Sequence, residues 1–267
     1  MIRKNIYRIA PLLVTFFFIV NCGTVPLTGR KQLTLIPESD LTQMSFDSYK
    51  QVLKESKLSN DPKQVNMVRR VGRNLANATE QYLTEQGYST SEYKWEFNVI
   101  KDDNTINAWC MPGGKIAIYT GILPIAQNDA GLAVVMGHEI AHAVAKHGNE
   151  RMSQGLLVQF GGIALSEALS SKPSETRDLY LMSYGVGAQV GAVLPYSRLH
   201  ESEADRIGLT LMAMAGYDPH EAVPFWERMN NVGGSRPPAF LSTHPAPSKR
   251  IEKIKEHLPE AMARYEK

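Results

Sequence analysis

Two histidines and a glutamate near the middle of the sequence have the spacing of a hydrolytic metal site. His138 and His142 lie four residues apart, so on a helix they project from one face about one turn apart. Two imidazoles placed in this way can bind one tetrahedral Zn²⁺ ion. Glu139 lies about 100° round the axis from His138, where its carboxylate can hold a water as a general base. The pattern predicts a zinc site with one coordination position left open for water.

The third metal ligand must come from another segment. A third histidine at the spacing that metzincins use is absent, because Ala145 and Gly148 occupy the two positions that would complete that motif. His147 lies about 180° round a continuous helix from His138. We therefore expect His147 to point away from the metal, as a cation near the C-terminal end of the helix.

An acidic helix further along the chain is the remaining source of a ligand. Glu201 and Asp205 share one helical face, whereas Glu203 lies about 200° from Glu201. Glu201 can bind the metal, and Asp205 can accept a hydrogen bond from a ligating histidine. Gly208 would let this helix approach another backbone closely. The alternative interpretation is a solvated acidic face.

The elements around these motifs are typical of an α+β protein that is mainly helical, with one small sheet beside the helix of His138. The expected helices span residues 41–57, 61–86, 128–153 and 197–215, with two more beginning at 218 and 248, and the expected strands span 93–99 and 115–120. The apolar stretches 155–169 and 179–195 are shorter than the ~18–20 residues that a membrane-spanning helix needs. We expect residues 155–195 to form a helical hairpin that covers the active site or dips into a lipid surface, and the alternative is a transmembrane pair.

The start of the chain differs in composition from the rest. Basic side chains precede an uncharged apolar run, Ile9–Val20, which is typical of a signal peptide and too short for a transmembrane helix. The run ends at Ile19-Val20-Asn21-Cys22, which resembles a bacterial lipobox. We expect a lipoprotein signal peptide over residues 1–21 with lipid on Cys22. The alternatives are a plain secretory signal or an uncleaved anchor.

The remaining residues fit one tethered domain. We expect an extended tether over residues 22–40 and a peptidase domain over 41–267. The chain has two cysteines, so lipid on Cys22 would exclude an intramolecular disulfide, whereas a free Cys22 in an oxidising compartment could pair with Cys110. The 29 basic and 27 acidic side chains leave a net charge of only +2, and no basic block is present. Nucleic acid is therefore excluded as a partner.

Several segments together resemble a known family. HEIAHAVAKH, followed about sixty residues later by SRLHESEADRIGL, resembles the zinc metallopeptidases that include HtpX, the CAAX prenyl proteases and the periplasmic proteases BepA and LoiP. NAWCMPGGKIAIYTGIL and LSTHPAPSKRI also match, so the resemblance covers about residues 24–260. The start VPLTGRKQLTLIPESDL is most similar to the LoiP-type branch.

The resemblance implies a gluzincin-like peptidase domain with one Zn²⁺ ion. It makes His138, His142 and Glu201 the zinc ligands and Glu139 the catalytic base. Asp205 falls on an aspartate of the family that is either a hydrogen-bond partner of the histidines or a proton donor, and the former is favoured because a ligating imidazole needs an acceptor. His244 also matches a family position. It could stabilise the oxyanion, bind the zinc as a fourth ligand that keeps the enzyme latent, or only pack its loop.

These features together predict a zinc-dependent endopeptidase of the bacterial cell envelope. It would be lipid-anchored and face the periplasm, and Gly23 after the cysteine favours the outer membrane. Its substrates would be misfolded or unassembled proteins, bound in extended form along the strand at residues 115–120. The alternative is an envelope chaperone or assembly factor with a latent protease site and envelope assembly partners. A prenyl-protein protease is disfavoured because long transmembrane segments are absent.

Overall fold

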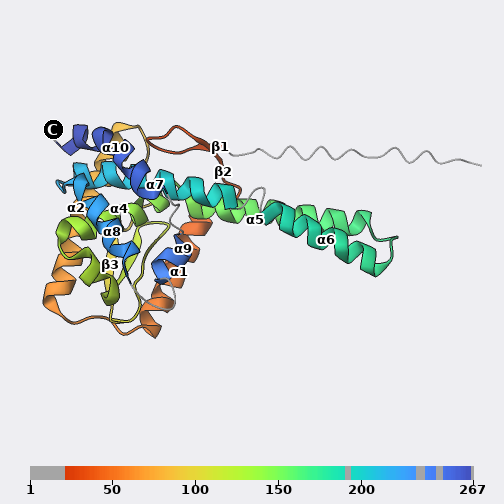
Figure 1. The fold of residues 1–267 in the computed structure, drawn as a ribbon, viewed down its shortest axis with the longest axis horizontal. Helices are drawn as coiled ribbons and strands as arrows, with labels where there is room; N and C mark the ends of the chain where they lie inside the picture. The colour runs from red at the N-terminus through yellow and green to blue at the C-terminus, as the bar shows by residue number, and fades with distance from the viewer. Residues whose placement is uncertain (1–21, 190–193, 233–237, 245–248, 266–267) are drawn as a thin grey trace, which may run out of the picture.

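The computed structural model describes residues 22–189, 194–232, 238–244 and 249–265. In these residues a helical body encloses a small sheet, and a pair of helices projects from one side of the body (Figure 1). The predicted class, α+β and mainly helical, is confirmed. The predicted signal peptide over residues 1–21 lies outside the described part of the chain.

The sheet beside the site has three strands. β3 (Glu96–Ile100) pairs in parallel with β5 (Lys115–Tyr119), and β4 (Ala108–Met111) pairs antiparallel with the other side of β5. The strand expected at 115–120 is confirmed, while the neighbouring strand begins three residues later than expected and β4 was not predicted. Because β5 is the central strand, both of its edges are already paired. The expectation that a substrate adds to this strand is therefore wrong, and β4 is the edge strand.

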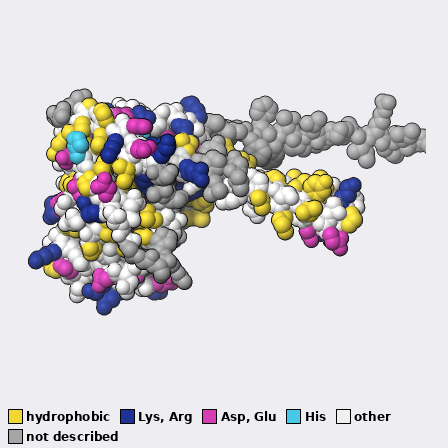
Figure 2. Space-filling model, in the orientation of Figure 1, with side chains coloured by type: hydrophobic (Ala, Val, Ile, Leu, Met, Phe, Trp, Pro, Cys, Tyr) yellow, Lys and Arg dark blue, Asp and Glu magenta, His cyan; other side chains and the backbone are white. Residues whose placement is uncertain are grey.

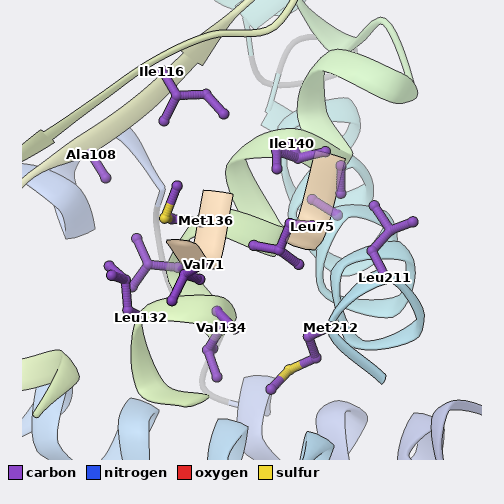
Figure 3. Packing of buried hydrophobic residues seen from close by; sticks show 14 of the residues in the cluster. Val71, Leu75, Ala108, Ile116, Leu132, Val134, Met136, Ile140, Leu211 and Met212 are labelled. Atoms are coloured by element: carbon purple, nitrogen blue, oxygen red, sulfur yellow. The ribbon is translucent and has the colours of Figure 1, made fainter. Parts of the chain in front are cut away.

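Helix α4 (Asp129–Val144) is the centre of the body. The side chain of Asn128 accepts a hydrogen bond from the Gly131 backbone N–H at 2.8 Å and caps the first turn. Leu132, Met136 and Ile140 are fully buried among side chains from the sheet and from two other helices. Figure 3 shows this cluster, to which α2 (Pro62–Glu85) and α7 (Leu194–Met214) contribute. After its first residue, and apart from the buried polar residues His138, Glu139 and His142, α4 is apolar on all sides, as expected of a helix at the middle of a domain.

Two glycines set the distance between α4 and α7. A Cβ atom at Gly208 would lie 2.9 Å from the backbone nitrogen of His138, and one at Gly137 would lie 3.0 Å from the carbonyl oxygen of Gly208. Real Cβ atoms essentially never come as close as at Gly208, and the distance at Gly137 is tighter than most real contacts, so the close approach of the two helices depends on the missing side chains. The close approach predicted for Gly208 is confirmed.

The helix expected to continue to residue 153 breaks soon after the histidines. α4 ends at Val144, and Lys146 has a φ of 53° in the left-handed region. α5 (His147–Ala168) then begins in a new direction and pairs with α6 (Ser174–Ala188). This pair is the predicted hairpin, but it projects away from the body instead of covering the site (Figure 1). No helix among the described residues is long and apolar enough to cross a membrane.

The segment expected to be an extended tether is folded onto the body. β1 (Cys22–Thr24) and β2 (Lys31–Leu33) form an antiparallel pair, and Val25 between them is fully buried. The chain then enters α1 (Glu38–Glu55). The remaining elements are η1 (Thr120–Ile122), α3 (Leu123–Ala126), η3 (Pro219–Glu221), α8 (Ala222–Asn230), α9 (Ala239–Thr243) and α10 (Arg250–Tyr265).

Candidate metal centre

The contact between α4 and α7 brings together the three residues that the sequence selects as metal ligands. The Nε2 atoms of His138 and His142 lie 3.1 Å apart. Oε2 of Glu201 lies 3.3 Å from the first of these nitrogens, and Oε1 lies 3.4 Å from the second. All three side chains are buried. Two helices that are distant in sequence therefore present their ligand-type atoms to one point.

His244 joins this group from the end of α9. Its Nδ1 atom lies 3.3 Å from Nε2 of His138 and 3.2 Å from Oε1 of Glu201. One ligand atom from each of these four residues lies within 4.8 Å of the others. Of the three interpretations of His244, simple loop packing away from the site does not fit this position.

The spacing of these atoms is close to that of a tetrahedral metal site. Zinc–nitrogen bonds of about 2.0 Å give a tetrahedron with edges of about 3.3 Å. Five contacts among the four residues are 3.1 to 3.4 Å long, counting both carboxylate oxygens of Glu201, and one ligand atom from each residue lies within 4.8 Å of the others. A buried carboxylate facing several imidazole lone pairs is also the donor set that zinc prefers. The residues present therefore fit one zinc ion.

Glu139 lies beside the ligand group and is buried with it. Oε1 of Glu139 is 3.3 Å from Nε2 of His244, and no hydrogen bond to that oxygen forms among the described residues. The backbone N–H of Cys110 in β4 donates to the carboxylate. Burial raises the pKa of Glu139, because the charged form loses its hydration, and the nearby histidines only partly offset this. A carboxylate with a raised pKa is suited to accept and return a proton.

Asp205 holds the far side of His138. Its Oδ1 atom lies 2.9 Å from Nδ1 of His138 and 2.6 Å from a guanidinium nitrogen of Arg250. The guanidinium of Arg250 in turn stacks 3.4 Å from the centre of the Trp226 ring. Burial alone would raise the pKa of Asp205, but the charge of Arg250 and the bond to His138 hold it below its ordinary value. Asp205 is therefore placed as a hydrogen-bond acceptor of the imidazole, facing away from the ligand atoms.

His147 is not where the sequence places it. Its Nδ1 atom lies 2.8 Å from Nδ1 of His142, and its Nε2 atom lies 3.0 Å from Oε2 of Glu203. The expectation that His147 points away is wrong because it assumed one continuous helix, whereas the left-handed Lys146 turns the chain back. Burial lowers the pKa of His147 to about 4, which keeps the ring neutral near pH 7.

Sequence reasoning missed the residues that support the ligands. These are His147, Glu203, Arg30 and Arg250. Arg250 lies in the LSTHPAPSKRI segment, so that motif could have indicated it. Arg30 lies in the VPLTGRKQLTLIPESDL segment, but no local pattern connects it with the site, because its carboxylate partners lie more than a hundred residues away.

Comparison with known proteins agrees with the geometry. Residues 62–258 match Peptidase family M48. The chain is 36% identical over 252 residues to the mitochondrial metalloendopeptidase OMA1 of Schizosaccharomyces pombe, covering 94% of this chain and 70% of the relative. It is 30% identical over 278 residues to the human mitochondrial metalloendopeptidase OMA1, covering 98% of this chain and 52% of the relative.

A bacterial relative is more distant. The beta-barrel assembly-enhancing protease of Escherichia coli is 25% identical over 239 residues, which cover 88% of this chain and 47% of that protein. The chain thus spans about half the length of the human and bacterial relatives. The resemblance to the LoiP-type branch receives no support from these matches.

The predicted location is contradicted by the same comparison. The yeast and human relatives are mitochondrial proteins by name, so the expectation of a bacterial envelope protein that faces the periplasm, with the outer membrane favoured, is wrong. Lipid on Cys22 stays a prediction. Cys110 is a partly buried free thiol in the described structure.

Proposed function

Because this chain belongs to peptidase family M48 and is a zinc-dependent metalloendopeptidase, we propose that His138, His142 and Glu201 hold its zinc ion. The observation that carries this assignment is the buried convergence of their ligand atoms, with contacts of 3.1 to 3.4 Å between them. When bound, zinc polarises the carbonyl of a peptide and lowers the pKa of a water toward neutrality. The residues of the chain must then position that water and move its protons.

Glu139 is the catalytic base in this proposal. Its free Oε1 atom is buried next to the ligand group, where a water beside the metal would lie within hydrogen-bond reach. The carboxylate takes one proton from the water as the water attacks the peptide carbonyl carbon. The same carboxylate then returns the proton to the leaving nitrogen, so that the C–N bond breaks to give a carboxylic acid and an amine.

Asp205 orients a ligand and does not act as the proton donor. Its contact with Nδ1 of His138 fixes the tautomer in which Nε2 carries the lone pair directed at the ligand group. Arg250 keeps Asp205 ionised and in place. A residue turned toward the outer side of His138 is poorly placed to reach a substrate nitrogen.

The substrate binds as an extended peptide along the outer edge of β4. This strand is at the edge of its sheet, and the N–H of Cys110 points from it toward Glu139. Pairing with backbone groups reads little side-chain sequence, so the enzyme selects segments that are unfolded and accessible. Misfolded or unassembled proteins are the substrate class that this selectivity favours, and the name of the bacterial relative, which refers to protein assembly, is compatible with it.

His244 favours a second role in which the protease is held latent. With His244 as a fourth ligand the metal would have no open position, as in structural zinc sites. The chain could then act mainly as a chaperone or assembly factor until His244 moves away. In this reading His244→Ala raises the rate of peptide cleavage, whereas a role at the oxyanion predicts a fall.

Zinc content and casein cleavage by three purified proteins test the proposal. The wild type and Glu139→Gln should each hold one zinc per chain, and only the wild type should cleave. Glu201→Ala should lose both zinc and activity. Full cleavage by Glu139→Gln, or full zinc content in Glu201→Ala, would overturn the assignment.

A further inference from the structure

The α5–α6 hairpin has almost no buried residues. No residue of α6 is buried, and none of α5 is buried beyond Ser153. Tyr184 lies at the contact between the two helices: its hydroxyl lies against Gly161 and donates to the carbonyl of Val158 at 3.1 Å. With so little side-chain burial, the pair gains little to offset the conformational entropy that is lost when the helices form, which indicates that a further surface covers the hairpin.

The outer surface of the hairpin is apolar. Between Gly155 and Leu169 the one charged residue is Glu167, and none occurs from Leu179 to Ala188. Charged side chains gather instead in the connecting turn and the first turn of α6. Figure 2 shows hydrophobic side chains along the projecting pair. Seven of them are 47–68% exposed: Leu157, Phe160, Ile163, Leu179, Tyr180, Met182 and Val186.

A second apolar stretch occurs in the sequence before the described residues. The run Ile9–Val20 ends two residues before Cys22, where β1 begins. The segment that follows β2 is fixed to the start of α5, because the backbone N–H of Leu35 donates to the Ser153 hydroxyl at 2.8 Å. The segment after β2 therefore contacts the root of the hairpin, and the apolar stretch lies only two residues before β1 in the sequence.

We propose that the apolar flank of the α5–α6 hairpin docks on the surface of a lipid bilayer. Neither α5 nor α6 is both long and apolar enough to cross a bilayer, and the run of twelve residues is too short by its sequence, so both suit the interface. The flank enters the acyl boundary, while the charged turn around Lys172 and Asp178 stays among the headgroups. The metal centre, which lies next to the first residues of α5, is then held beside the membrane.

Fluorescence quenching by brominated lipid tests this placement with the full chain. Phe160→Trp and Met44→Trp are each reconstituted in phosphatidylcholine and phosphatidylethanolamine vesicles, and the signal of the three native tryptophans is subtracted. Met44 is a matched control because it is 56% exposed, close to the 58% of Phe160, but belongs to α1 on the body. We expect at least two-fold stronger quenching at position 160 than at 44. Equal quenching at the two positions would overturn the proposal.

A second copy of the chain is the competing occupant of the same flank. Met182 is 68% exposed. If a second copy covers the flank, the Met182→Cys variant should rapidly form a disulfide-linked dimer in the same vesicles. A dimer accompanied by no excess quenching at position 160 also overturns lipid docking. Excess quenching with monomeric Met182→Cys supports it.

A separate set of contacts ties the N-terminal loop to the ligand His142. Nε2 of His147 faces the Glu203 carboxylate and therefore carries a proton. The neutral ring then has a lone pair on Nδ1, so the proton between the two Nδ1 atoms belongs to His142. That tautomer leaves Nε2 of His142 as the free donor toward the ligand group.

Arg30 holds Glu203 in this position from the loop between β1 and β2. Its guanidinium contacts Glu203 at 2.8 and 2.9 Å and forms a bidentate pair with Glu150 at 2.7 and 2.8 Å. The hydroxyl of Thr28 also donates to Glu203, and Nε2 of His200 lies 2.9 Å from Glu150. The carboxylates are buried, so each bond is shielded from water.

We infer that His147, Glu203 and Arg30 are positioning residues that fix the tautomer and orientation of His142. This inference rests on the proposed role of His142 as a zinc ligand. It makes the folded N-terminal loop part of the metal centre. Partners of this kind commonly change metal affinity by about 10- to 100-fold.

Zinc affinity, measured by competition with a chromophoric chelator, tests this inference. His147→Leu removes both hydrogen bonds, and we expect at least ten-fold weaker zinc binding. His147→Asn keeps an acceptor near Nδ1 and should recover part of that loss, which a purely structural role would not produce. Arg30→Met should weaken binding several-fold. Arg70→Met is the matched control, since Arg70 forms a bidentate pair with Asp129 of α4 at 2.7 and 2.8 Å but has no link to His142.

Zinc binding by two variants distinguishes the positioning role of His147 from the assignment of His142 as a ligand. If His142→Ala loses zinc but His147→Leu binds it as tightly as the wild type, the positioning role is wrong and the ligand assignment stands. If His142→Ala keeps its zinc, the ligand assignment itself fails.

Discussion

Helices α4 and α5 are separated by only Ala145 and Lys146 but have opposite surroundings. α4 is buried almost throughout and carries the candidate ligands, whereas α5 is buried only at its first residues and then leaves the body. The change happens at the left-handed Lys146. The comparison shows that the candidate ligands are held on a helix that is packed on all sides. The exposed apolar surface of α5 begins only a few residues further along the chain.

The largest effect on activity should come from a substitution in the buried helix α4. Glu139→Gln keeps the size of the side chain but removes the base, so we expect kcat for casein or a peptide substrate to fall by about 10³-fold. Zinc content should not change. A residual rate within ten-fold of the wild type would assign the base to another residue.

Acid should destabilise the body through its buried carboxylates. Burial opposes their ionisation, but hydrogen bonds from His200 and Arg30 to Glu150, and from His147 and Arg30 to Glu203, lower the pKa of each to about 2. Since both values lie below the ordinary 4.5, this stability is complete above pH 4.5 and is lost as the pH falls toward 2. Each group contributes on the order of 2 kcal/mol.

Denaturant unfolding between pH 5 and pH 2.5 measures this loss. Arg30→Met, which removes a partner of both carboxylates, should unfold with a shallower dependence on pH than the wild type. An identical slope in the two proteins would show that Arg30 does not cause the lowered pKa values.

Replacing one glycine at the α4–α7 contact and one in α5 by alanine compares the packing of the two regions directly. Gly208→Ala places a methyl group 2.9 Å from the backbone of α4, and we expect it to destabilise the protein by about 1–3 kcal/mol and to weaken zinc binding. Gly155→Ala in α5 meets no atom within 4 Å, and should stabilise its helix by up to about 1 kcal/mol. Thermal unfolding of both variants measures the difference, and equal melting temperatures would contradict the close contact of α4 with α7.

Local signals in the sequence were sufficient for the ligand-bearing helices. The i, i+4 spacing of His138 and His142 and the face shared by Glu201 and Asp205 depend only on helical periodicity, so their placement could be predicted. Gly208 indicated the close approach for a simple steric reason. The family resemblance added His244, which the structure brings to the same group.

The remaining features depend on tertiary contacts that periodicity does not contain. The left-handed conformation of Lys146 broke the helix and brought His147 back to His142, although lysine has no special preference for that conformation. β4 is short and ends in a turn at Gly113 and Gly114, so alternation could not reveal it. The bonds of Arg30 join segments that no local pattern relates.

The smallest effect should come from the hairpin. Leu179→Ser replaces a side chain that is 62% exposed, so the free energy of unfolding in solution should change by less than about 0.5 kcal/mol. Cleavage of a short soluble peptide should also be unaffected. A larger destabilisation, measured by chemical denaturation, would mean that another part of the chain covers this flank.

The central claim is that α4 and α7 together hold one zinc ion through imidazole and carboxylate groups. X-ray absorption at the zinc edge of the purified full chain tests it most directly. We predict one zinc per chain, surrounded only by nitrogen and oxygen at about 2.0 Å with the scattering pattern of at least two imidazoles, and loss of this signal in Glu201→Ala. Sulfur in the coordination sphere, or an unchanged spectrum in Glu201→Ala, would contradict the claim.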